Sequence, residues 1–300
     1  MRIHIGLDIG GTKLIVAAAD TQGVLLRQTQ CPTPRDLDEG LELLKAMTRR
    51  VAGEDSIAAI GASAGGPLDH VTGIVSPLHQ PQWRDVPLRA IFEREFGRPF
   101  AVDVDTNAAA LAEYRWGGDT PERLLYLTLS TGMGGGLVIG GALYRGAGGV
   151  HPEVGHQAVP PVGSFPHPVI CECGSESCLE SFVSGNGIRR LYGKPAEQLD
   201  PAEWAEVAVN LGLGLRNMAV CYAPDVIAIG GGVAVGGGEP FLTQARRVMA
   251  QGLKLVPAPE VRLSRLGYET ALRGAIALAM TAAGESGGKI NAELNIDDFA

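Results

Sequence analysis

The sequence has no uninterrupted apolar stretch of the roughly 20 residues that a membrane-spanning helix needs. It also lacks an excess of positive charge, because 33 acidic and 25 basic residues leave a net charge of −8 at pH 7. Such a chain has no electrostatic reason to bind nucleic acid or an anionic membrane. The first residues enter a strand-like pattern directly, without the layout of a signal peptide. We therefore expect a cytoplasmic protein that binds neither nucleic acid nor membrane.

Cysteine is scarce, with five residues, and a reducing compartment makes a disulfide framework unexpected. Three of the five crowd together and follow a histidine, which gives the set His156, Cys171, Cys173 and Cys178. One histidine and three cysteines make a closed tetrahedral site for structural zinc, with no open position for catalysis. The alternative is a group of unligated thiols. Cys31 and Cys221 stand apart and are expected to be ordinary packed residues.

Two common nucleotide-binding signatures, G-x-x-x-x-G-K-[ST] and a complete G-x-G-x-x-G, are absent. Glycine is instead abundant, with 42 residues of 300 against roughly 7% in average proteins, and it clusters in a few tight turns. Residues 8–13 form one such turn between strand-like segments 2–7 and 14–19. A second turn, 130–136, lies between strand-like segments 123–129 and 137–139. Two hairpins about 120 residues apart suggest two similar α/β domains that face each other across a cleft.

In the rest of the chain, patterns typical of β-strands alternate with patterns typical of α-helices. Further strands are expected at 57–62, 99–104 and 225–229, and helices at 37–51, 88–96, 106–116, 204–223 and 270–283. We place an N-terminal α/β domain at 1–117 and a C-terminal α/β domain, with the zinc-binding loop, at 118–284. A helix within about 270–300 is a candidate to complete the first domain, and the polar residues after 284 are expected to be mobile at their end.

Each glycine turn could cradle phosphate, because glycine allows backbone N–H groups to approach an anion closely. Asp8 would not contact phosphate itself but would hold Mg²⁺, through water. A third glycine turn, 230–232, follows a buried strand and could lie against a flat base such as adenine. The alternative for each is an ordinary hairpin turn. The residues expected at the nucleotide are Asp8, Gly10, Gly11, Thr12, Lys13, Ser130, Thr131, Gly132, Gly231 and Gly232.

Asp105 is the candidate general base. It lies where a strand ends and a helix begins, which is where open α/β sheets bind ligands. A carboxylate there could accept the proton of a substrate hydroxyl during phosphoryl transfer. The alternative is a helix N-cap, a position that favours Asp and Asn. Of the two aspartates in this segment, Asp103 is the one expected to be structural. Glu153 and Glu180, in the loop that zinc would order, could accept hydrogen bonds from sugar hydroxyls.

Taken together, these motifs resemble the ROK family (repressor, open reading frame, kinase), whose kinase members phosphorylate hexoses and their derivatives. The resemblance covers nearly the whole chain and rests on DIGGTK at 8–13, DTNAAALAE at 105–113, STGMGGG at 130–136, EVGH at 153–156, CECG at 171–174 and CLE at 178–180. It implies an α/β, actin-like and hexokinase-type (ribonuclease H-like) two-domain fold with a cleft, Mg-ATP as the donor, and a homodimer.

The resemblance also implies roles for single residues. Asp105 is implied as the general base, and zinc is implied on His156, Cys171, Cys173 and Cys178. The implied sugar contacts are Gly66, Asp105, Glu153, His156 and Glu180, and Asn107 is expected to line the same pocket.

Two positions depart from the family pattern. Many members carry Asn immediately before the catalytic Asp, where it bonds a sugar hydroxyl, and this chain has Val104. Many also have Gly before the last zinc cysteine, and this chain has Ser177. Residues 151–153 resemble ROK fructokinases, whereas residues 83–88 and the CxCG loop resemble glucokinases. We therefore expect conversion of glucose to glucose 6-phosphate, with a fructokinase or an N-acetylhexosamine kinase as the alternatives.

Three functions of other classes compete with a kinase. ROK repressors carry a helix-turn-helix segment before the first glycine turn, which in this sequence already begins at residue 8. A non-catalytic sugar sensor would not need Asp105, and an actin-like structural ATPase would not need a zinc-ordered sugar loop. The sequence therefore favours an ATP:sugar phosphotransferase.

Overall fold

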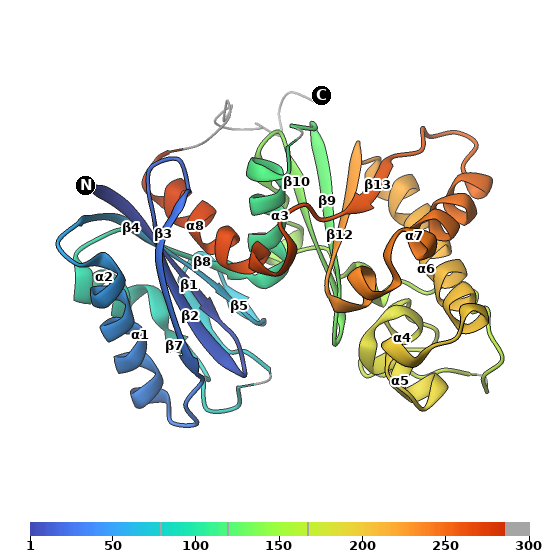
Figure 1. The fold of residues 1–300 in the computed structure, drawn as a ribbon, viewed down its shortest axis with the longest axis horizontal. Coiled ribbons are helices and arrows are strands. Elements are labelled where there is room, and N and C mark those ends of the chain that lie inside the picture. The colour runs from blue at the N-terminus through green and yellow to red at the C-terminus, as the bar shows by residue number, and fades with distance from the viewer. Residues whose placement is uncertain (79, 119, 167, 286–300) are drawn as a thin grey trace.

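Two five-stranded sheets, one in each half of the chain, organise the computed structural model, which describes residues 1–78, 80–118, 120–166 and 168–285 (Figure 1). The first sheet has the order β3-β2-β1-β4-β8. Its strands are β1 (Arg2–Ile9), β2 (Lys13–Ala19), β3 (Leu25–Pro32), β4 (Ser56–Ala64) and β8 (Phe100–Val104). β1 pairs antiparallel with β2 and parallel with β4, and β4 pairs parallel with β8.

Helices cover both faces of this sheet. Side chains of β1 alternate, so that Ile3, Ile5 and Leu7 join the core shared with α1 (Leu37–Ala52) and α2 (Leu88–Phe96). The opposite face receives α8 (Thr270–Ala282), which packs on β1, β4 and β8. Gly61 is required there, because a Cβ at this position would lie 2.0 Å from the Ala275 carbonyl oxygen of α8. Glycine in the strand thus permits a close helix–sheet approach.

The second sheet has the order β11-β10-β9-β12-β13. Its strands are β9 (Arg123–Leu129), β10 (Met133–Ile139), β11 (Ala142–Leu143), β12 (Val226–Gly230) and β13 (Glu260–Leu263). One face packs on a helical layer that contributes to the largest core cluster. That layer contains α4 (Glu180–Val183), α5 (Gly185–Tyr192), α6 (Pro201–Tyr222) and α7 (Gly232–Gly252).

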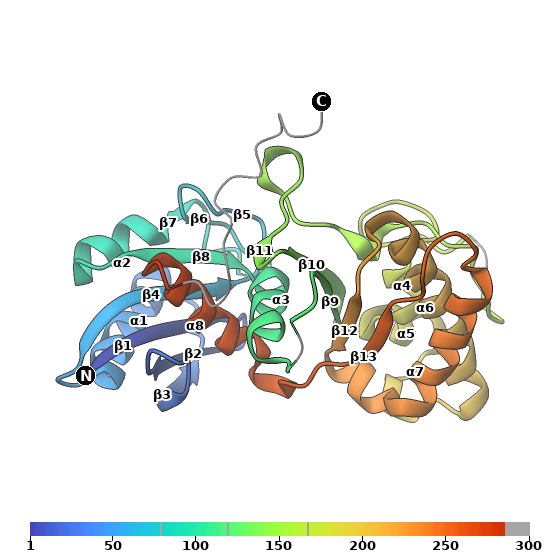
Figure 2. The ribbon, with the colours of Figure 1, turned by 90° about the horizontal axis from the view of Figure 1, so that it is seen from above.

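Helix α3 (Asp105–Trp116) lies between the two halves, as both views show (Figures 1 and 2). It packs on α8 and on β9 and β10. Its alanines allow this on several sides at once: Ala108 meets α8, where a Cβ at Gly274 would lie 2.3 Å from the Ala108 carbonyl, and Ala110 belongs to the cluster with β9. The alanine-rich sequence is therefore explained by a helix packed against both halves of the molecule.

The remaining elements are short. A small sheet contains β5 (Leu68–Asp69), β6 (Ile74–Val75) and β7 (Val86–Pro87), and 3₁₀ turns form at η1 (Ala147–Gly149), η2 (Val154–His156), η3 (Ala196–Gln198) and η4 (Gly267–Glu269). Among the described residues, every helix is too short or too polar to span a bilayer.

The predicted elements are confirmed at all seven helix and strand positions of the first 116 residues that the sequence identified, with shifts of a few residues at the ends. The predicted turn at 130–136 is too long, because residues 133–136 belong to β10. Glycine is needed inside that strand: a Cβ at Gly136 would lie 2.5 Å from the Thr106 carbonyl oxygen of α3. The sequence also left β3, α5, α7 and β13 unpredicted. Helix α8 packs on the first sheet, and the domain boundary between 117 and 118 stays a prediction. The predicted mobile end lies, from 286 on, outside the described residues.

Candidate active site

A cavity of about 1070 Å³ lies between the two halves and is lined from both. The N-terminal half contributes the ends of β1, β4 and β8, and the C-terminal half contributes the β9–β10 turn and the segment before η2. The strands β1, β4 and β8 are parallel, so their carboxyl ends meet at one edge of the sheet. Twelve of the predicted site residues line this cavity: Asp8, Gly10, Gly11, Gly66, Asp105, Asn107, Ser130, Thr131, Gly132, Glu153, His156 and Glu180.

The first glycine turn is held from two sides. The Gly10 N–H donates to the Lys13 carbonyl at 3.1 Å, which closes the hairpin. The Gly10 carbonyl accepts from Thr33 Oγ1 at 2.6 Å and from Gln80 Nε2 at 3.1 Å. Gln80 is almost fully buried, and no feature of the sequence identified it. The turn is thus fixed before any ligand binds.

Asp8 lies at the end of β1 and lines the cavity. Burial, and after it the nearby Asp105 carboxylate, raises the pKa of Asp8 to about 6, whereas Lys13 acts in the opposite direction. A buried carboxylate whose pKa is raised by a second carboxylate nearby is a favourable place for a divalent cation, which would stabilise the charged form.

The second turn consists of Ser130, Thr131 and Gly132. The Ser130 and Thr131 carbonyls accept from the N–H groups of Gly185, at 2.7 Å, and Asn186, at 3.0 Å, at the start of α5. The Met133 N–H donates to Glu180 Oε2 at 2.8 Å. The two glycine turns therefore reach one cavity from opposite halves, each held by residues distant in the chain.

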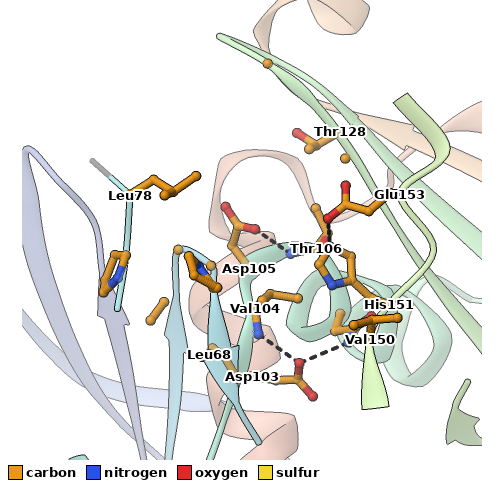
Figure 3. Close-up of a pocket in the computed structure, with 18 of the residues that line it drawn as sticks. Leu68, Leu78, Asp103, Val104, Asp105, Thr106, Thr128, Val150, His151 and Glu153 are labelled. Atoms are coloured by element: carbon orange, nitrogen blue, oxygen red, sulfur yellow. Dashed lines mark hydrogen bonds and ion pairs between the residues drawn. The ribbon is translucent and has the colours of Figure 1, made fainter. Parts of the chain in front are cut away.

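Asp103 and Asp105 point in opposite directions from the β8–α3 junction (Figure 3). Asp105 points into the cavity, and its Oδ1 accepts from the Thr106 N–H at 2.8 Å. Asp103 is buried, and its Oδ1 accepts from the Val104 N–H at 2.8 Å and from Asn107 Nδ2 at 2.9 Å. Its other oxygen pairs with Arg145. This agrees with a structural role for Asp103, whereas the Asp105 carboxylate is directed into the cavity.

Asn107 also borders the cavity, and its Oδ1 is buried without a hydrogen-bond partner among the described residues. A buried polar atom without a partner is costly unless a ligand or water satisfies it. This atom is thus a candidate ligand contact, whereas the amide nitrogen of the same side chain is occupied by Asp103.

Glu153 enters from the C-terminal half and shares the cavity with Asp105 (Figure 3). Its side chain is 59% exposed, and His151 Nε2 lies 3.4 Å from its Oε1. His156 follows within η2. Glu180, the first residue of α4, has one oxygen on Met133 N and the other 3.9 Å from Cys171 Sγ. Carboxylates around one cavity can accept hydrogen bonds from the hydroxyls of a polyhydroxylated ligand, and an imidazole can donate or accept them.

The ligand atoms of His156, Cys171, Cys173 and Cys178 all lie within 4.8 Å of one another. Cys171 Sγ lies 3.7 Å from His156 Nδ1, and Cys173 Sγ lies 3.7 Å from Cys178 Sγ. A tetrahedral zinc with bonds of about 2.0–2.3 Å would hold its ligands roughly 3.5–3.8 Å apart, so the four residues fit this ion. Hydrogen bonds from Ser175 lower the pKa of Cys173 to about 7, toward the thiolate that binds metal. His156 also lines the cavity, and because Nδ1 is directed at the cluster, Nε2 is not needed as a metal ligand.

The structure places both Ser177 and the two cysteines that lie outside the cluster. Ser177 adopts a φ of +58°, in the left-handed region that favours glycine. The Ser177 carbonyl and N–H still bond Val159 and Val169, so the loop closes despite the substitution. The expectation that both remaining cysteines are packed is wrong for Cys221, which is exposed on α6, while Cys31 is half-buried beside Met47.

Four predicted nucleotide contacts do not line the cavity: Thr12, Lys13, Gly231 and Gly232. Lys13 acts on Asp8 through its charge. Gly231 has a φ of +94° between β12 and α7, and a Cβ there would lie 2.3 Å from the Leu129 carbonyl oxygen. A packing reason therefore suffices for that glycine, whereas a Cβ on Gly232 would meet only open space.

Known proteins resemble this chain over almost its full length. The model of the ROK family matches residues 4–282. A ROK hexokinase from Thermus thermophilus has a similar structure, with a TM-score of 0.84, 34% identity, and coverage of 94% of this chain and 99% of the other. A ROK family glucokinase from Streptomyces griseus, solved with glucose and AMPPNP, gives a TM-score of 0.74, 30% identity and coverage of 93% and 99%. A fructokinase from Zymomonas mobilis is also 30% identical, over 94% of this chain and 97% of its own. These similarities confirm the predicted actin-like, hexokinase-type α/β fold.

Proposed function

The chain belongs to the ROK family, and we propose that it is an ATP-dependent hexokinase that converts glucose to glucose 6-phosphate. The observation that carries the proposal is Asp105, a carboxylate that points into a cavity with a glycine turn on either side. The turns offer backbone N–H groups to phosphate, and Asp105 offers a proton acceptor to a hydroxyl. Relatives at 30–34% identity carry the names hexokinase, glucokinase and fructokinase.

The proposed reaction is one in-line transfer. Asp105 accepts the proton of the sugar 6-hydroxyl while that oxygen forms a bond to the γ-phosphorus, and the bond from phosphorus to the β,γ-bridging oxygen breaks. The products are the sugar 6-phosphate and ADP. Glu153, His156, Glu180 and Asn107 would hold the remaining hydroxyls, which fixes the attacking oxygen near the phosphorus.

The cofactors follow from the same residues. Asp8 would hold Mg²⁺ through water, and the ion would neutralise charge on the phosphates. Ser130, Thr131, Gly132, Gly10 and Gly11 would contact phosphate, with Lys13 contributing charge. Zinc on the His156 and cysteine set would order the loop that carries Glu153 and Glu180, without taking part in the chemistry. We also propose a homodimer and a cytoplasmic location, as the resemblance and the composition predict.

Sequence identity does not distinguish the sugars, because a glucokinase and a fructokinase relative are each 30% identical to this chain. A coupled ADP-release assay across glucose, fructose, mannose, N-acetylglucosamine and N-acetylmannosamine decides between them. We expect the highest kcat/KM with glucose. Fructose or an N-acetylhexosamine as the best substrate would replace glucose in the proposal, and no ADP release with any sugar would contradict a kinase.

A further inference from the structure

Residues 144–151 leave the C-terminal half and reach the N-terminal half at the wall of the cavity. Arg145 pairs with Asp103, at the end of β8. Four residues later Gly149, with a φ of +79°, lies so close to His70 that a Cβ would be 2.7 Å from its Cε1. The segment thus contacts the opposite half at two points.

The Asp103 carboxylate is the buried end of this connection. Its side chain is 2% exposed, and that of Arg145 is 25% exposed. Oδ1 accepts from the Val104 N–H and from Asn107 Nδ2, while Oδ2 has Arg145. A carboxylate this deeply buried is costly without a cation, because neutral hydrogen bonds offset only part of its lost hydration. Arg145 therefore supplies the positive charge that compensates the buried Asp103 carboxylate.

Asp103 in turn determines the geometry of the β8–α3 junction. It binds the N–H of the residue immediately before Asp105 and the side chain of the residue two positions after it. If Asp103 rotates away, the Val104 N–H and Asn107 Nδ2 both lose their acceptor and the first turn of α3 is freed to shift. A displacement of about 1 Å at a reacting group can cost roughly a hundredfold in rate.

We propose that Arg145 is a positioning residue that acts on Asp105 through Asp103, and that this pair couples the base to the segment carrying His151 and Glu153. The proposal rests on the proposed kinase function and deepens it. Arg145 lines the cavity but needs no contact with substrate for this role. The Arg145–Asp103 ion pair would then fix the position of Asp105 relative to the segment that carries His151 and Glu153.

The test is a double-mutant cycle on kcat with Arg145→Met, Asp103→Asn and the double variant, measured by ADP release with the best sugar of the native enzyme. Asn keeps acceptor and shape at position 103 but removes the charge that needs Arg145. We expect Arg145→Met to lower kcat about 10–100-fold, with the KM for ATP changed less than threefold. The double variant should be no slower than Arg145→Met, because a neutral residue 103 no longer lacks a cation.

Two further variants keep the test decisive. Arg246→Met removes another half-exposed arginine that pairs with a carboxylate, Glu239 on α7, and should leave kcat within twofold. Arg145→Lys keeps the charge and should recover most of kcat, which also serves if the methionine variant does not fold. Losses that multiply in the double variant, or a higher KM for ATP with unchanged kcat, would overturn the proposal. An inactive native enzyme would instead contradict the kinase function itself.

Discussion

The two ends of α3 each have a buried ion pair, but the polar groups around the two pairs differ. Each end has a buried carboxylate paired with an arginine of the C-terminal half: Asp103 with Arg145 just before the helix, and Glu113 with Arg262 near its last turn. At the Glu113 end the carboxylate is saturated by protein. Oε1 also accepts from the Arg265 N–H at 3.3 Å, and Oε2 accepts from Ser264 Oγ at 2.7 Å.

At the N-terminal end of α3, some buried polar atoms lack hydrogen-bond partners among the described residues. Thr106 Oγ1 and Asn107 Oδ1 are buried there without hydrogen-bond partners among the described residues, and Asp105 points into the cavity. Polar groups that a protein buries but does not satisfy require a ligand or water. One helix therefore joins the two halves at its C-terminal end and offers polar groups to a ligand at its N-terminal end. We expect mutations to divide the same way, into losses of stability and losses of activity.

The largest effect is expected from Glu113→Ala. Glu113 is fully buried, so its removal takes away the buried carboxylate that pairs with the Arg262 guanidinium, which is 10% exposed, while the exposed Glu260 carboxylate stays 3.6 Å from Arg262 Nε. Loss of one partner of a buried ion pair costs about 3–5 kcal/mol. Denaturant unfolding should show this loss, and replacing both partners in Glu113→Leu with Arg262→Met should cost less. An alanine variant within about 1 kcal/mol of the native protein would remove Glu113 from this role.

Asp105→Asn should lower activity and leave stability nearly unchanged, the reverse of Glu113→Ala. The amide keeps an acceptor for the Thr106 N–H, so the helix start is retained, and stability should change by less than about 1 kcal/mol. The amide cannot take a proton, and kcat should fall by at least about a hundredfold while sugar binding stays near normal. Steady-state kinetics and sugar titration, with thermal unfolding as the control, measure the three quantities. Near-normal turnover would exclude Asp105 as the base.

Metal removal tests whether zinc orders the loop that carries Glu153 and Glu180, on the side of the cavity opposite Asp105. Elemental analysis of the native protein should find one zinc per chain. Cys178→Ser should lose the metal, lower the Tm, and raise the KM for sugar by about tenfold or more, because Glu153, His156 and Glu180 share the ordered loop. The control is Cys221→Ser, an exposed cysteine outside the cluster, which should change none of these. Native protein without zinc would contradict the assignment.

The sequence predicted what local pattern determines. Periodicity identified α1 and α2, and motifs identified twelve of the residues that line the cavity. Helix α7 was missed because Gly236, Gly237, Gly238 and Pro240 break its helical pattern, and Gly238 in fact adopts a φ of +61°. Arg145 and Gln80 were missed because their partners lie 42 and 70 residues away in the chain. The two glycine turns were predicted, whereas the side chains that hold them and the junction in place depend on tertiary contacts.

The smallest effect is expected at Val104, between Asp103 and Asp105 at the N-terminal end of α3. Its side chain is buried and faces Gly66, where a Cβ would lie 3.4 Å from Val104 Cγ1. A valine cannot bond a hydroxyl, so the native enzyme should discriminate weakly at one position of the sugar. Val104→Asn supplies a donor and an acceptor, and one added hydrogen bond is worth about 0.5–1.5 kcal/mol, or roughly 2–12-fold in the ratio of kcat/KM between two sugars. The matched control is Val104→Thr, which keeps the branched shape and adds a single hydroxyl. If neither variant changes kcat/KM for any sugar in the panel, the position does not read the substrate, and the unsatisfied polar groups beside it must serve another ligand atom.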